Sequence, residues 1–167
     1  MANYILEGIY FYSGFMFFYN LGRMGKMSGS AQEIRYINRD ENTHLWLFRS
    51  ILLELKKEEP ELFGPDQVEV YRSMLKRGVE EEIAWAEYVL GDRIEGLTLE
   101  MISDYIHYLG NLRATALNFA PLYDGFSDVP ESMKWVNVYS NANLIKTDFF
   151  EAKSTAYAKS SAIEDDL

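Results

Sequence analysis

Residues 34–55 read IRYINRDENTHLWLFRSILLEL, and this stretch decides the fold class. Its apolar residues recur three or four positions apart, which indicates an amphipathic α-helix. Glu41 and His44 occupy the middle of the apolar stripe, three residues apart and therefore on one face of the helix. A carboxylate and an imidazole thus stand where core residues are expected, and a buried charge without a cationic partner is costly. The apolar stripe itself consists of Ile34, Ile37, Leu45, Phe48, Leu52 and Leu55.

An uncharged stretch rich in Phe and Tyr, residues 8–22, precedes this helix. It is shorter than the roughly 20 residues that a membrane-spanning helix needs, and it lies between Glu7 and Arg23. We therefore expect a buried helix and no association with a membrane. Glu7 falls on the expected apolar stripe of this helix, which consists of Tyr4, Phe11, Phe15 and Phe18.

The length and composition of the chain indicate one helical domain. Its 167 residues are 48% hydrophobic, and no strand-like alternation occurs, so the expected class is all-α. The absence of cysteine excludes disulfides, zinc–thiolate sites and iron–sulfur clusters. A net charge of -10 argues against nucleic acid as a partner. Because no signal peptide is recognisable, a cytoplasmic location is expected.

Local signals predict four helices. They cover residues 3–23, 30–58, 65–91 and 98–118, with Ser30 and Glu33 as a capping box, Pro65 in a first turn and Thr98 as an N-cap. Residues 121–148 are expected to be irregular, and residues 149–167 to form a disordered tail. The run at residues 80–82 is interpreted as a solvated acidic face, and His107 is not nominated for a site.

Two neighbouring helices that each aim a carboxylate inward predict a metal site. A lone Glu7 on one helix and a Glu-x-x-His pair, Glu41 and His44, on the next make half of the ligand set in helical di-metal bundles. Carboxylate oxygens with a single imidazole suit iron or manganese. The alternative interpretation is a solvated Glu–His pair without metal.

The chain resembles the small subunit of ribonucleotide reductase. The resemblance rests on residues 6–15, LEGIYFYSGF, and residues 37–44, INRDENTH, and it continues through residues 85–88 and 108–113. It implies that residues 1–148 form the C-terminal half of a ferritin-like helical bundle, and that residues 149–167 are a flexible tail that docks onto the large catalytic subunit.

The resemblance also implies roles for individual residues. Glu7, Glu41 and His44 match the family's metal ligands for a di-metal centre, with iron expected first and manganese or mixed manganese–iron as alternatives. Phe11, Phe15 and Ile37 match the apolar pocket around the radical site. Asp40 and Tyr157 match residues that transfer the radical, with Glu151 six residues before the tail tyrosine.

The family's remaining ligands, an Asp and a second Glu-x-x-His, are not found in the sequence, nor is the tyrosine that usually bears the radical. We therefore expect a second polypeptide that carries the N-terminal half, or a chain that is a fragment, and self-association into a dimer of such pairs. Two alternative functions are another ferritin-like di-metal oxidase and a non-catalytic helical interaction module.

Overall fold

The computed structural model describes residues 1–140, so the predictions for the tail and for residues 141–148 lie outside the described part of the chain. Residues 1–140 hold one isolated bridge, Ile94 to Leu97, and no strand, which confirms the all-α class. The elements are α1 (Ala2–Ile5), the π-helical η1 (Leu6–Tyr10), α2 (Tyr12–Arg23), α3 (Ser28–Glu58), the 3-10 turn η2 (Pro60–Phe63), α4 (Pro65–Val89), α5 (Leu99–Ala116), the 3-10 segment η3 (Glu131–Val136) and α6 (Asn137–Ser140).

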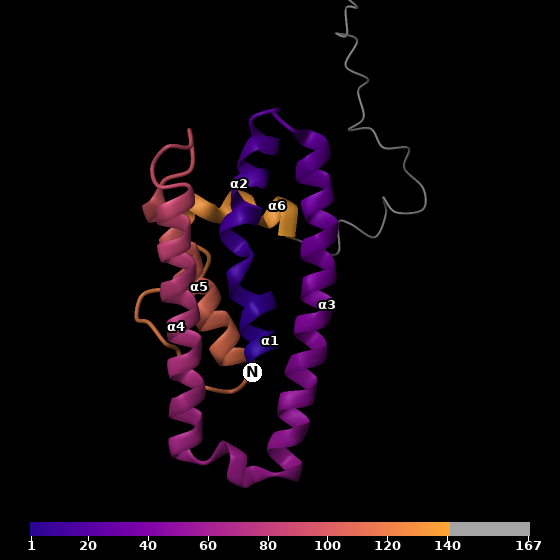
Figure 1. Ribbon diagram of the computed structural model, residues 1–167, viewed down its shortest axis with the longest axis vertical. Coiled ribbons are helices and arrows are strands. Elements are labelled where there is room, and N and C mark those ends of the chain that lie inside the picture. The colour runs from indigo at the N-terminus through magenta and orange to yellow at the C-terminus, as the bar shows by residue number, and fades with distance from the viewer. Residues whose placement is uncertain (141–167) are drawn as a thin grey trace, which may run out of the picture.

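The two longest helices, α3 and α4, run antiparallel and are joined by η2 at one end (Figure 1). The first segment, α1–η1–α2, lies between them, and α5 packs behind it against α4 (Figure 1). The chain then crosses back through η3 and α6, where the Tyr139 ring stacks on Tyr19 at 4.8 Å between centroids. Among residues 1–140, no helix is long and apolar enough to cross a membrane.

Several helix ends follow the local sequence signals. Pro65 begins α4, and the Thr98 side chain accepts a hydrogen bond from the backbone N–H of Met101 at 3.2 Å. Gly91 follows the end of α4 with a φ of +52°, a conformation that favours glycine. The predicted boundaries at these ends therefore hold to within two residues.

Two expectations about the helices are wrong. The first helix is not continuous, because η1 interrupts it with π-helical geometry, and side chains of α4 and α5 contact this interruption. The helix α3 begins at Ser28 after Met27, whose φ is +49°, and no side-chain cap forms at its start, so the expected capping box is absent. The region expected to be irregular has no helix over residues 121–130 and contains the short η3 and α6 after them.

The core lies between the first segment, α4 and α5. The first segment buries Tyr4 and Phe15 of the expected stripe, whereas Phe11 stays 38% exposed. It also buries residues outside that stripe, namely Ile5, Ile9, Tyr12, Met16 and Tyr19, so the buried face is turned away from Phe11. The helix α3 buries only Ala31, Asn38 and Leu45, each seven residues from the next. Its contact with the rest of the described chain is therefore a narrow seam, and large apolar side chains elsewhere on α3 remain exposed: Ile37, Trp46, Leu47 and Ile51.

Candidate metal centre

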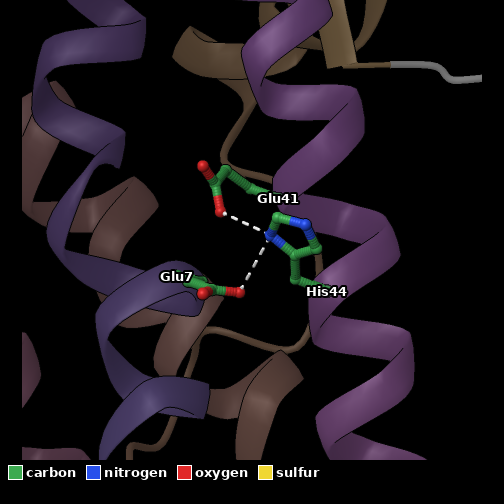
Figure 2. Close-up of side chains that lie close together, drawn as sticks. All are labelled: Glu7, Glu41 and His44. Atoms are coloured by element: carbon green, nitrogen blue, oxygen red, sulfur yellow. Dashed lines mark hydrogen bonds and ion pairs between the residues drawn. The ribbon is translucent and has the colours of Figure 1, made fainter.

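Three side chains from η1 and α3 converge on one point (Figure 2). The Nδ1 atom of His44 lies 3.4 Å from Oε2 of Glu7 and 3.4 Å from Oε2 of Glu41. The three potential ligand atoms all lie within 4.8 Å of one another. The fold thus brings the Glu7 carboxylate to a carboxylate and an imidazole that lie 34 and 37 residues later in the sequence.

The docking of α3 on the first segment brings these residues together. Asn38 is buried and donates its Nδ2–H to the Tyr19 hydroxyl at 3.0 Å. Leu45 is buried and packs close to Gly8: a Cβ added to Gly8 would lie 3.0 Å from the Cδ2 atom of Leu45. Glu41 and His44 lie between these two contacts, so the seam that docks α3 also orients the Glu-x-x-His pair toward Glu7.

The donor set fits a metal ion. The Oε2 atom of Glu7 is buried and has no hydrogen-bond partner, and such an atom normally has one. The side chains of Glu7 and Glu41 are each 17% exposed, while that of His44 is 52% exposed. A hard divalent cation would neutralise both carboxylates and would bind the Glu7 oxygen that lacks a hydrogen bond, with imidazole as a further ligand.

Arg113 of α5 is hydrogen-bonded to the segment that carries Glu7. Its Nε–H donates to the carbonyl of Gly8 at 3.1 Å, and its Nη2–H donates to the hydroxyl of Tyr12 at 2.9 Å. Its own carbonyl accepts a hydrogen bond from the Tyr4 hydroxyl at 3.0 Å. Glycine is favoured at residue 8 because a Cβ there would make a tight contact, 3.0 Å from the Arg113 Nε atom.

Glu82 corrects the interpretation of the acidic run as a solvated face. Its side chain is 1% exposed, and its Oε1 atom accepts a hydrogen bond from the backbone N–H of Ser13 at 2.9 Å. Burial raises the pKa of Glu82 to about 7, and the bond from Ser13 opposes that rise only in part. By contrast, Glu80 and Glu81 are exposed, as expected.

Sequence reasoning missed both Glu82 and Arg113, although a signal for each was present. Glu82 continues a line of buried α4 residues at helical spacing, Leu75, Val79 and Ala86. Arg113 likewise continues the line Ile102, Ile106 and Leu109 on α5. Glu41 and His44 stand out in the sequence because they are polar residues inside an apolar stripe. The same pattern marks Glu82 on α4 and Arg113 on α5.

The residues expected to line the radical pocket or to transfer the radical differ in their burial. Phe15 is buried, with its ring centroid 6.2 Å from that of Phe11, but Phe11 and Ile37 are 38% and 39% exposed. Asp40 is exposed and accepts two hydrogen bonds from the Arg39 guanidinium, the shorter at 2.9 Å. Tyr157 and Glu151 lie outside the described residues.

His107 was not nominated, and its surroundings are those of a packed helix residue. Its Nδ1 atom lies 2.8 Å from the carbonyl of Ser103, one turn earlier, and its ring stacks on Phe126 at 4.9 Å between centroids.

Comparison with known proteins adds independent information. Residues 1–130 match the family described as "Ribonucleotide reductase, small chain". The subunit beta of the ribonucleoside-diphosphate reductase from Treponema pallidum is 70% identical over 167 residues, which are 100% of this chain and 48% of that protein. The corresponding subunit from Halalkalibacterium halodurans is 43% identical over 158 residues, which cover 95% of this chain and 45% of that protein.

Solved structures agree with the sequence comparison. The ribonucleotide reductase R2 subunit from Clostridium botulinum superimposes with a TM-score of 0.79 at 50% identity, over 84% of this chain and 44% of that one. A putative class I ribonucleotide reductase from Bacillus halodurans gives a TM-score of 0.77 at 40% identity, over 80% and 42% of the two chains.

The fold therefore belongs to the all-helical, ferritin-like class, and the described residues form part of such a bundle. The chain belongs to the ribonucleotide reductase small chain family. It spans about half the length of the curated relatives that it matches.

Proposed function

We propose that this chain supplies three ligands, Glu7, Glu41 and His44, to the di-metal centre of a ribonucleotide reductase small subunit. In that role it takes part in the reduction of ribonucleotides to deoxyribonucleotides. The convergence of the three side chains, with a buried Oε2 atom on Glu7 that accepts no hydrogen bond and lies 3.4 Å from His44 Nδ1, is the observation that carries the proposal.

Each residue has a defined task in the proposed site. The carboxylates of Glu7 and Glu41 hold and neutralise the ions, and His44 contributes a neutral nitrogen through Nδ1, the atom nearest to both carboxylates. When bound, the metal pair supplies the oxidising power that generates the radical. Phe15, buried two turns after Glu7 on the first segment, excludes water from this region, and Phe11 and Ile37 complete an apolar wall once their exposed sides are covered.

Three ligands do not complete a di-metal site, because helical bundles of this kind use about six. We propose that a second polypeptide supplies the Asp, the other Glu-x-x-His and the radical tyrosine. The exposed apolar residues of α3 outside its seam support this proposal, since a surface of that kind marks a contact with another chain. Two such pairs then form the dimer, and the pair engages the large subunit through residues 149–167, where Tyr157 relays the radical that Asp40 helps to conduct.

Metal binding in an assembled subunit tests the proposal. The chain is co-expressed with the part of the Treponema pallidum relative that it does not cover, and Mn²⁺ binding is measured from the loss of the free-ion electron paramagnetic resonance signal. We expect about two ions per pair. Glu41→Ala should abolish stoichiometric binding, whereas Glu54→Ala, at an exposed position of the same helix, should leave it unchanged.

The two variants separate the possible outcomes. Equal metal binding by Glu41→Ala and the parent pair would overturn the assignment of ligands. Binding of about two ions by the chain alone would overturn the requirement for a second polypeptide. A pair that assembles but binds no metal would favour the alternative of a non-catalytic interaction module.

A further inference from the structure

The segment that carries Glu7 is contacted by two buried, oppositely charged side chains that do not pair with each other. Arg113 is 9% exposed and Glu82 is 1% exposed. Within residues 1–140, neither forms an ion pair. Instead, Glu82 Oε1 accepts from the backbone of Ser13, and Arg113 donates to the backbone of Gly8 and to the Tyr12 hydroxyl. Buried ionisable side chains are normally paired, so these contacts with the first segment require a reason.

The reason lies in the π-helical geometry of η1. A π-helical turn contains an extra residue and is rare, so it needs support from outside the helix. Arg113 contacts residues 4, 8 and 12, one below the segment, one within it and one above it. These three positions are four residues apart and lie on one side of the first segment. The guanidinium of Arg113 holds residues 8 and 12, and its backbone carbonyl holds residue 4, so one residue of α5 spans the whole irregularity.

The other end of the irregularity is held from α4. The helix α2 begins at Tyr12, and the first N–H groups of a helix lack partners within it. Glu82 accepts one of them, the Ser13 N–H, from a neighbouring helix. The preceding residue, Glu81, accepts a hydrogen bond from the Tyr10 hydroxyl at 2.5 Å. Two consecutive residues of α4 thus fix the junction between η1 and α2.

We propose that Arg113 and Glu82 are positioning residues for Glu7, a role that rests on the proposed metal site. They hold residues 6–10 in the π-helical form, and this form aims the Glu7 carboxylate at Glu41 and His44. If the segment became a regular α-helix while α2 stayed packed, Glu7 would turn by about 100° around the helix axis, which is the rotation of one residue. The carboxylate would then leave the cluster.

The test uses the assembled pair described above and two measurements. Mn²⁺ affinity shows whether the Glu7 carboxylate lies beside Glu41 and His44. Amide hydrogen exchange over residues 7–13 in the metal-free pair shows whether the backbone hydrogen bonds of the segment are kept. Glu82→Ala and Arg113→Gln should weaken Mn²⁺ binding on the order of 10- to 100-fold and accelerate exchange. Glu82→Gln keeps an oxygen acceptor for the Ser13 N–H and should retain most of the affinity.

The matched control is Asn111→Ala. Asn111 is 5% exposed on the same helix as Arg113, but its side chain holds the loop at residues 122–126 instead of η1. It should lower the melting temperature without changing Mn²⁺ affinity. The proposal is overturned if Glu82→Ala and Arg113→Gln bind Mn²⁺ like the parent, or if Asn111→Ala weakens binding equally. Where Arg113→Gln does not assemble, Arg113→Lys gives the same comparison with a smaller change.

The two measurements also separate this proposal from the proposed function. If the parent pair binds no Mn²⁺, the metal site fails, and the exchange data still decide whether Arg113 and Glu82 hold the segment. Unchanged exchange in both variants overturns the positioning role whatever the metal result.

Discussion

Replacement of Glu82 by Gln should change how the stability of the protein depends on pH. Burial raises the pKa of Glu82 from 4.5 to about 7 in the folded state. A carboxyl group with a raised folded pKa binds more protons in the folded state than in the unfolded state between these values. Its contribution to stability is therefore greatest below the unfolded pKa and is lost as the pH rises through the folded pKa.

The magnitude follows from the two pKa values. Lowering the pH from about 8.5 to about 5.5 should increase the free energy of unfolding by about 2 kcal/mol through Glu82 alone. Tyr10 and Glu81, which are hydrogen-bonded to each other at the same junction, do not change charge in this window. Burial and the hydrogen bond to Glu81 raise the pKa of Tyr10 to about 12, and the bonds from Tyr10 and Arg77 lower the pKa of Glu81.

Urea denaturation of the assembled pair, at one protein concentration and several pH values, measures this effect. The parent and Glu82→Gln share every other titrating group, so the difference between their unfolding free energies isolates Glu82. That difference should change by about 2 kcal/mol between the two pH values. A difference that is constant with pH would refute the reasoning, because it would mean that Glu82 titrates alike in the folded and unfolded states.

Three further predictions concern packing, the metal site and the tail. Gly8→Ala should destabilise the protein by about 1–3 kcal/mol, since its Cβ would meet Arg113 and Leu45 at 3.0 Å, whereas Gly14→Ala, with open space, should be neutral or stabilising in thermal melts; equal effects would contradict the close approach. His44→Ala should weaken Mn²⁺ binding by 10-fold or more, an order-of-magnitude expectation for a lost ligand, in the same titration as Glu41→Ala; unchanged affinity would remove His44 from the ligand set. Tyr157→Phe should stop nucleotide reduction while metal content and binding to the large subunit stay at parent values, and full activity in that variant would exclude the relay.

Local chemistry along the sequence determined the class of the fold and several of its boundaries. Helical spacing of apolar residues was enough for the all-α class, and Pro65 and Thr98 marked helix starts because a fixed φ and a side-chain cap act within one turn. The pair Glu41 and His44 was also readable, since residues three apart share a face whatever surrounds the helix. The resemblance to the reductase family then supplied the roles that spacing alone does not assign.

Tertiary structure decided the features that depend on contacts between distant residues. The break at η1 has no local marker, because the groups that stabilise it, Arg113 and Glu82, come from α5 and α4. The same packing buried one member of an acidic run and left its neighbours in solvent. It also turned Phe11 partly outward. Side-chain spacing reports which residues share a face, but the direction of that face is set by the helices packed around it, and for Glu7 that direction is what places its carboxylate beside His44.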